Sequence, residues 1–417
     1  MRVRSEQFRL MATVSVAHAL VHALELTYAA LLSRIDNEFG SGLFVLGIVA
    51  NAFAFTFGAS ALPSGVLVDR LGSRKVLYLC FLAAAGAALL VATSSNVVML
   101  GFFLGLLGLA IGLYHPAGIS LIAQAAEQRG MALGYHGVSG NIGVALAPVL
   151  AVGLAEAFGW RSAYLFLAAL AVLVALMVRL VQVGGRERET PAPAPANAEA
   201  PARHASLLSP TVLPLFLVYA IFVLNGFIYR GSMTFLPLHI EEHVHISFLG
   251  LDEAALAGSL TTLALLAGAA GQLFGGALSQ RYALERLAVP FALMVAPALL
   301  LMGISGGLAL VAAAAVFVFF NFGSQPVYTG LIADYSPQRA LGRSFGISFF
   351  AAFGLGSIAA TFAGFLADRW GTESVFLALA AFACLTLGLA ITIWRLSLRP
   401  RATEAEAGEV APDVGGE

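Results

Sequence analysis

A series of twelve long apolar runs constrains this chain more than any other feature. A helix needs about 20 apolar residues to cross roughly 30 Å of hydrocarbon. The runs are continuously apolar and do not alternate with polar residues, which favours helices over a β-barrel. Hydrophobic residues make up 59% of the chain and charged residues only 11%, a balance that is far from that of a water-soluble domain. The sequence therefore predicts an all-α integral membrane protein.

The domain organisation follows from the spacing of these runs. The predicted spans lie near residues 10–33, 44–68, 76–93, 97–122, 131–157, 161–182, 211–238, 254–278, 287–304, 307–332, 341–366 and 372–395. The segment between the sixth and the seventh span is polar and rich in alanine and proline, which is typical of a linker. We therefore expect a six-helix bundle at 1–183, a cytoplasmic linker at 184–209, a second bundle at 210–397 and a disordered tail at 398–417.

An internal repeat supports this division into two six-helix units. When the sequence is shifted by 210 residues, Pro116 falls on Pro326 and Trp160 falls on Trp370. Parallel repeats of this kind are a transporter architecture, in which the substrate binds between the halves near the middle of the membrane. Basic residues gather in the loops on the side of the two termini, whereas the opposite loops hold only Arg34, Arg161 and Arg369. This bias predicts that both termini are cytoplasmic.

The loop after the second run carries a family resemblance. The stretch GVLVDRLGSRKVL at residues 65–77 resembles the loop 2–3 signature of the major facilitator superfamily. The matching residues that we expect to form a gating latch are Gly65, Asp69, Arg70, Gly72 and Arg74. Glycine lets helices approach closely, and Asp69 can pair with Arg70 or with a neighbouring helix. The alternative interpretation is an ordinary basic cytoplasmic loop.

Two further stretches point to branches of the superfamily. The stretch GNIGVALAPVLAVG at residues 140–153 is similar to the helix 5 signature of antiporters, through Gly143, Pro148 and Gly153. The alternative is a tightly packed helix with no bearing on the direction of transport. The stretches HPAG, GVSGNIG and SVAHALVHALE resemble the fosmidomycin-resistance-like branch, which implies export of small, often anionic compounds. The arginine that drug–proton antiporters carry in helix 4 is replaced by Leu104.

Polar side chains inside the apolar runs are the candidates for function, because a charge at the centre of a spanning helix costs roughly 2.5–3.5 kcal/mol on insertion scales. The resemblance implies that helices 1, 4, 7 and 10 line a central cavity. The predicted substrate-binding residues, most of them in those helices, are His18, Tyr28, Tyr114, His136, Asn141, Asn225, Tyr229, Arg230, Asn321, Gln325 and Tyr328.

Glu25 and Arg230 are the strongest of these candidates. A carboxylate that gains and loses a proton as the cavity opens to each side can couple transport to protons. Arginine does not deprotonate, so Arg230 is either the partner of Glu25 or a clamp for a substrate carboxylate or phosphonate. The alternative is a static salt bridge between the halves. His22 lies three residues before Glu25 and four after His18, so the three share a helix face.

His115 and Pro116 form a dipeptide inside an otherwise apolar run. Proline removes a backbone hydrogen bond and lets the helix bend. His115 can cap the carbonyl that the proline frees, bind substrate, or relay protons, and we include it with Glu25 and His22 as a proton-coupling candidate. The cluster His239, His243 and His245 is read as a solvent-facing surface loop in preference to a zinc site.

These observations together predict a secondary transporter that moves a small, often anionic molecule by alternating access, with proton-coupled efflux as the expected mode. An importer or facilitator of metabolites, or a non-transporting sensor of the same fold, remains an alternative. Nothing in the sequence predicts an enzyme, a cofactor, a bound metal or a nucleic-acid partner. We expect a monomer that spans the bacterial plasma membrane many times.

Overall fold

The computed structural model describes residues 2–125, 129–181, 213–245, 253–337 and 341–398. The first half contains α1 (Arg2–Ala30), α2 (Leu32–Phe39), α3 (Gly42–Leu71), α4 (Ser73–Ala92), α5 (Val97–Gly112), α6 (Tyr114–Ala125), α7 (Arg129–Phe158) and α8 (Arg161–Leu180). The second half contains α9 (Leu213–His243), α10 (Glu253–Ser279), α11 (Leu284–Ile304), α12 (Gly307–Tyr335), α13 (Leu341–Phe349), α14 (Ile358–Trp370) and α15 (Thr372–Ser397). Within these residues, 12 helical segments are long and apolar enough to span a membrane, which confirms the predicted all-α membrane protein.

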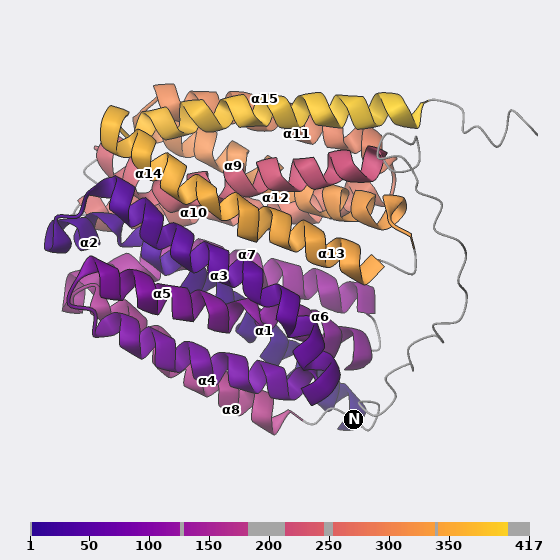
Figure 1. Cartoon of the computed structure of the whole chain (residues 1–417), viewed down its shortest axis with the longest axis horizontal. Helices are drawn as coiled ribbons and strands as arrows, with labels where there is room; N and C mark the ends of the chain where they lie inside the picture. Colours follow the sequence, from indigo (N-terminus) through magenta and orange to yellow (C-terminus); the bar gives the residue numbers. More distant parts are fainter. Residues whose placement is uncertain (1, 126–128, 182–212, 246–252, 338–340, 399–417) are drawn as a thin grey trace, which may run out of the picture.

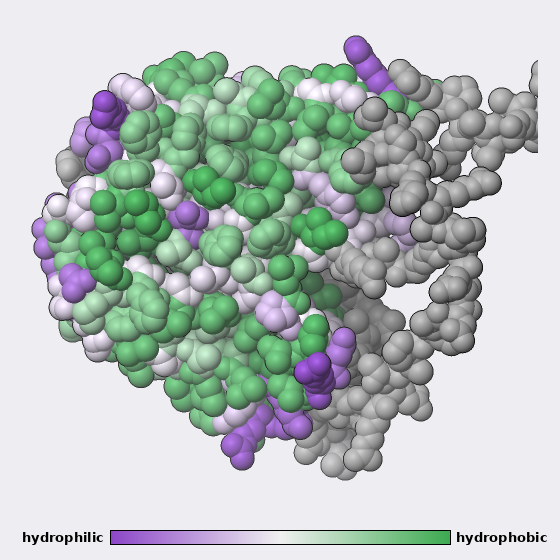
Figure 2. Space-filling model, in the orientation of Figure 1, coloured by the Kyte–Doolittle hydropathy of each residue, from purple (hydrophilic) through white to green (hydrophobic). Residues whose placement is uncertain are grey.

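The two halves lie side by side, with the first half below and the second half above in Figure 1. The chain begins at the end of the bundle at which α15 finishes; we call this the terminal end, and the end that carries α2 the distal end. Figure 2 shows hydrophobic surface over the middle of the molecule and hydrophilic residues mainly at the two ends. Large apolar side chains such as Phe102 and Leu263 are exposed, as lipid-facing residues are in a membrane protein.

The predicted linker at 184–209 and all but the first residue of the predicted tail at 398–417 lie outside the described residues. Six of the spans precede that linker and six follow it. The domain boundaries stay a prediction.

The most extensive contacts between the halves within the described residues are those of α7 with α10 and of α3 with α14. Near the distal end, a Cβ placed on Gly47 of α3 would lie 2.4 Å from the carbonyl oxygen of Ala360. The backbone amide of Leu43 also donates to Asp368 at 3.1 Å. Gly65 lies near the terminal end of the same α3 helix and faces open space. The halves are therefore held together tightly at the distal end.

Two spans depart from regular α-helix. The fourth span breaks at Leu113, between α5 and α6, directly before Tyr114, His115 and Pro116. Pro326, the repeat equivalent of Pro116, lies inside the continuous helix α12, so the two copies differ: only the first is interrupted. The eleventh span contains a π-helical turn at Phe350–Gly354 and a 3₁₀ turn at Leu355–Ser357. Single π turns of this kind often occur at functional sites.

An ion pair at the distal end gives a pH-dependent contribution to stability. The Oε1 and Oε2 atoms of Glu38 in α2 accept from the guanidinium of Arg161 at 2.6 and 2.8 Å, and Oε2 also accepts from Trp160. The hydrogen bond from Arg161 holds the pKa of Glu38 below its usual value. A lowered folded pKa stabilises the fold above the unfolded pKa, about 4.3, and this contribution is lost as the pH falls through the folded pKa.

We expect Glu38→Gln to lower the free energy of unfolding by no more than about 1 kcal/mol at neutral pH, because the pair is largely exposed. The difference from the wild type should vanish in acid. Thermal unfolding in detergent at a series of pH values measures it. An equal loss at neutral and acidic pH would show that the charge of Glu38 is not responsible.

Candidate functional site

The centre of the molecule holds a buried ion pair between the two halves. Oε1 of Glu25 in α1 lies 2.7 Å from Nη2 of Arg230 in α9. The Glu25 side chain is 0% exposed and that of Arg230 6%. The sequence predicts Arg230 as either a partner of Glu25 or an anion clamp, and in this conformation the partner geometry is formed. A pair this deeply buried is stable only while both charges are present.

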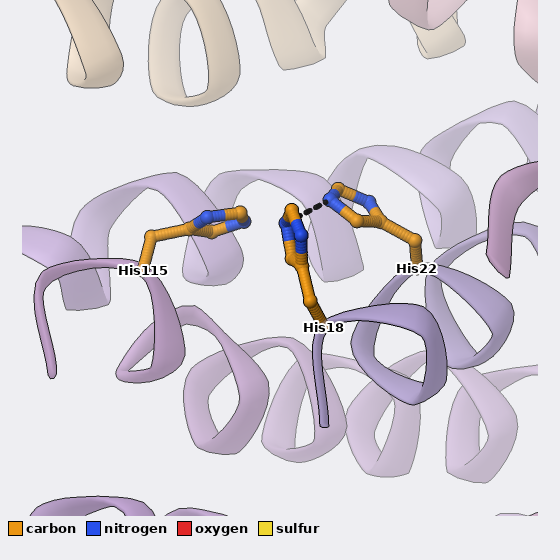
Figure 3. A group of neighbouring side chains, drawn as sticks. All are labelled: His18, His22 and His115. Carbon is orange, nitrogen blue, oxygen red and sulfur yellow. Dashed lines mark hydrogen bonds between the residues drawn. The ribbon is translucent and has the colours of Figure 1, made fainter. Parts of the chain in front are cut away.

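A chain of histidines continues from the second carboxylate oxygen of Glu25. Oε2 lies 2.6 Å from Nδ1 of His22, whose Nε2 lies 3.1 Å from Nε2 of His18. Nδ1 of His18 then donates to the backbone carbonyl of His136 at 2.6 Å. Figure 3 shows the rings of His18 and His22 meeting at their Nε2 atoms. The shared face of α1 expected from the spacing of these residues is therefore formed.

The contacts along this chain need more hydrogens than neutral imidazole rings carry. A carbonyl oxygen only accepts, so Nδ1 of His18 carries a hydrogen. The contact between the two histidines needs a second hydrogen, and the contact from His22 to Glu25 needs a third. Two neutral imidazoles supply only two. The observed geometry thus requires one proton more than neutral histidines and an ionised Glu25 provide.

Arg230 has little room around it. It borders a cavity of about 10 Å³ that is also lined by Glu25, Tyr28, Phe53 and Thr234, which is about the space for one water. Its Nε atom makes no hydrogen bond within the described part of the chain. Within the described residues, the expected central cavity is reduced to this small space beside Arg230. A substrate anion could reach Arg230 only after Glu25 releases it.

His115 stands beside this chain on α6. Its ring centroid lies 5.3 Å from those of both His18 and His22, and Figure 3 shows it directed toward them. Its Nε2 atom is buried and has no hydrogen-bond partner among the residues the structure describes. A ring nitrogen from each of the three histidines lies within 4.8 Å of the others, so they could hold a metal ion. In the structure, His18 and His22 instead contact each other through their Nε2 atoms.

Tyr114 and His136 support His18 from behind. The ring of His136 is stacked on that of His18, with centroids 3.8 Å apart. The Tyr114 hydroxyl lies 3.0 Å from Nε2 of His136 and donates to the carbonyl of Val14 at 2.8 Å. Both residues are buried. They are brought to the site as predicted, and they orient His18 rather than face a cavity.

Other predicted binding residues are partly brought to the centre. The ring of Tyr229 lies 5.7 Å from the Arg230 guanidinium, and Tyr28 lines the small cavity while its hydroxyl donates to the carbonyl of Leu46. Asn141 bonds to Gln272 across the interface between α7 and α10. That interface contact explains its burial without a ligand.

The predicted polar residues of the second half form a separate group. The Asn225 side chain lies beside the Tyr328 hydroxyl, linking α9 to α12. Asn321 is buried and Gln325 is exposed. The structure does not bring these four residues into contact with the Glu25–Arg230 pair.

The predicted latch residues form no ion pair with one another or with other residues that the structure describes. Asp69 and Arg70 are exposed, and Asp69 makes no ion pair within the described residues. Gly65 makes no close helix contact, contrary to expectation, because the halves meet tightly at the opposite end of α3. Gly72 adopts a φ of 82° at the turn into α4, a conformation that favours glycine. Arg74 donates to the backbone carbonyl of Arg179.

Sequence reasoning missed Gln272, the partner of Asn141 in α10. It is a polar side chain in an otherwise apolar run, and the rule that selected Asn141 would also have selected it. His239 was also placed wrongly from the sequence: its side chain is 0% exposed, on helix α9. The expectation that this histidine lies on a solvent-facing loop is wrong, because α11 and α15 cover it.

Comparison with known proteins agrees with this architecture. The family model of the Major Facilitator Superfamily matches residues 14–255 and 249–414. The probable sulfoacetate transporter SauU of Cupriavidus necator is 26% identical over 63% of this chain and 62% of its own length. The probable L-galactonate transporter of Escherichia coli is 27% identical over 34% of this chain and 32% of its own. The matched regions thus span less than two thirds of these relatives.

Solved structures share the fold. A bacterial homologue of the human lysosomal transporter Spinster, in an inward-facing and occupied conformation, has a TM-score of 0.73 at 15% identity and covers 94% of this chain and 98% of its own. A POT family transporter in complex with 5-aminolevulinic acid has a TM-score of 0.74 at 11% identity and covers 93% and 96%. The family match over most of the chain, together with the 12 candidate spans, establishes that this multi-pass membrane protein belongs to the Major Facilitator Superfamily.

Proposed function

We propose that this chain is a secondary transporter of a small organic anion, coupled to protons through Glu25 and the histidines of α1. The single observation that carries the proposal is the buried contact of Glu25 with Arg230 on one side and with His22 on the other. We place it in the bacterial plasma membrane as a monomer with both termini in the cytoplasm, following the distribution of its basic residues.

The geometry favours transport of proton and anion in the same direction. A substrate anion and the Glu25 carboxylate compete for Arg230, the permanent cation at the centre. Protonation of Glu25 frees Arg230 for the substrate, and a bound anion in turn favours protonation of Glu25. By linkage each ligand strengthens the binding of the other by the same factor. With a proton gradient directed inward, such a transporter takes up its substrate.

The substrate class follows from Arg230 and from the names of relatives. A guanidinium binds planar or tetrahedral oxyanions through two parallel hydrogen bonds. Relatives are described as transporters of sulfoacetate, of L-galactonate and, in the case of an Arabidopsis thaliana protein, of anions. We therefore propose a carboxylate or sulfonate of similar size.

Proton-coupled efflux is a second candidate, and one observation favours it. In the helix 5 signature, a Cβ on Gly143 would lie 2.0 Å from the carbonyl oxygen of Ala19 in α1, so the glycine permits the close helix contact that the antiporter signature implies. Exchange requires that substrate and proton displace each other. The proposed membership of the fosmidomycin-resistance-like branch belongs with this candidate.

Reconstituted vesicles with a pH-sensitive dye inside distinguish the two candidates. Sulfoacetate or L-galactonate added outside should acidify the interior if proton and anion travel together, and should raise the internal pH if they exchange. Fosmidomycin serves as the third probe. Failure of all three probes to bind or move would contradict the proposed substrate class.

Glu25→Gln is the matching variant. It keeps a hydrogen-bond acceptor for Arg230 and removes the exchangeable charge, so we expect exchange of labelled substrate across the membrane to persist while accumulation driven by a pH gradient is lost. Glu156→Gln, which removes an exposed distal carboxylate, should behave as the wild type. Gradient-driven accumulation by Glu25→Gln at the wild-type rate would exclude Glu25 as the coupling group.

A further inference from the structure

A second group of titratable side chains lies at the distal end of α9, away from the central site. His239, Glu242 and His243 are three and four residues apart, so they share one helix face. Across from them, α15 begins with Thr372 and Glu373. Ligand atoms of His239, Glu242 and His243 all lie within 4.8 Å of one another.

Both histidines have one ring nitrogen fixed by a backbone carbonyl. Nε2 of His239 donates to the carbonyl of Met302 in α11 at 2.9 Å, and Nδ1 of His243 donates to the carbonyl of His239 at 3.0 Å. In a neutral imidazole the other nitrogen then presents a lone pair. Fixing the tautomer through a carbonyl in this way is what proteins do to histidines that bind metals.

The free ring nitrogens of His239 and His243 each face an oxygen atom, one from Thr372 and one from Glu373. Nε2 of His243 lies 2.9 Å from Oε1 of Glu373. Nδ1 of His239 lies 2.8 Å from Oγ1 of Thr372, whose one hydrogen goes to Oε2 of Glu242. Both contacts therefore need a positive charge that neutral histidines and ionised carboxylates do not provide. Protons or one divalent cation would supply that charge, and the close approach of three ligand atoms favours the cation.

We propose that His239, Glu242 and His243 bind one Zn²⁺ ion, and that Glu373, which contacts His243, turns to supply the fourth ligand. Two imidazole nitrogens and one carboxylate oxygen are a ligand set found in zinc sites, and a second carboxylate can complete the tetrahedron. The bound ion would neutralise both carboxylates, and Thr372 would move aside to bond a liganding oxygen. The side chains of His243 and Glu373 are 24% and 45% exposed, so the ion can enter from water at the distal end.

Zinc at this position would tie the last turn of α9 to α15. The same turn carries Glu241, which accepts a hydrogen bond at 3.0 Å from Ser33 of the first half. The ion would thus stiffen the segment that helps to close the distal end. This role is independent of the substrate and of proton coupling at Glu25.

The test uses the full-length protein, purified in detergent without a histidine tag and stripped of metal. Equilibrium dialysis against Zn²⁺ alone, with metal analysis of both chambers, should show one ion per chain. Co²⁺ in its place should give the intense visible absorption of a tetrahedral site. His243→Asn and Glu373→Gln should each weaken binding at least about tenfold, while Glu241→Gln, on the same turn but outside the cluster, should not.

Two results would overturn the proposal. One is a wild-type protein that binds no zinc while size-exclusion chromatography shows it to be folded. The other is zinc binding that survives His243→Asn but is lost in His22→Asn, since that would assign the ion to the central histidines His18, His22 and His115.

Discussion

Glu25→Leu should lower the free energy of unfolding by about 3–5 kcal/mol, because it leaves the buried Arg230 guanidinium without its anion. Arg230→Met should cost less. The carboxylate that it leaves unpaired still contacts His22 at 2.6 Å, and a carboxylate can take up a proton and become neutral, whereas arginine cannot. The double variant Glu25→Leu/Arg230→Met should recover most of the loss, since buried ion pairs are often replaced by apolar residues at little net cost.

Thermal and chemical unfolding in detergent measure these differences, with transport of labelled anion measured in parallel. All three variants should fail to transport, because each lacks the carboxylate that couples protons, the guanidinium that binds the anion, or both. The physical account would be wrong if the double variant were as unstable as Glu25→Leu. It would also be wrong if Arg230→Met were the less stable of the single variants.

Gly47→Val should open the distal end of the molecule. A Cβ at Gly47 would lie 2.4 Å from the carbonyl oxygen of Ala360 and 3.2 Å from Cα of Gly364. Both are backbone atoms, so α3 and α14 must move apart rather than a side chain rotating. Overpacking of this kind costs about 1–3 kcal/mol, which corresponds to a shift of about 5- to 150-fold toward conformations in which this contact is broken.

Cross-linking detects this change. Oγ of Ser33 in the first half lies 3.0 Å from Oε2 of Glu241 in the second half. Cysteines placed at these two positions, in a background without the exposed Cys384, should link rapidly in the wild type and much more slowly with Gly47→Val. The matched control is Gly86→Val, because Gly86 of α4 faces open space. Equal cross-linking in all three backgrounds would show that the contact at Gly47 does not hold the distal end closed.

The spans and the central ion pair were within reach of sequence reasoning. Apolar runs of sufficient length have few alternatives to membrane helices, and 12 spans are found. Glu25 and Arg230 stand out because a charge in hydrocarbon is expensive and must find a partner. The sequence separation of 205 residues did not hide the pair, since the family resemblance implied that both helices line one central cavity.

The surroundings of that pair could not be predicted, because they depend on how helices dock. The stacking of His136 on His18 depends on the register of α7 against α1. His239 resembles a surface residue in its sequence context, yet Met302 and Thr372 arrive from α11 and α15 to enclose it. The break before His115 also differs from the unbroken helix around Pro326, which shows that the same residue type does not fix local geometry.

The π-helical turn at Phe350–Gly354 divides the eleventh span into two helical arms that can bend relative to each other. Beyond this turn, Ile358–Trp370 stays docked on α3. Before it, Leu341–Phe349 reaches toward the terminal end and places Phe349 against the ring of His115 at 5.2 Å. A disrupted hydrogen-bond ladder bends at low energetic cost. The terminal arm can therefore swing away from His115, exposing the histidines to one side, while the distal arm keeps the other side sealed.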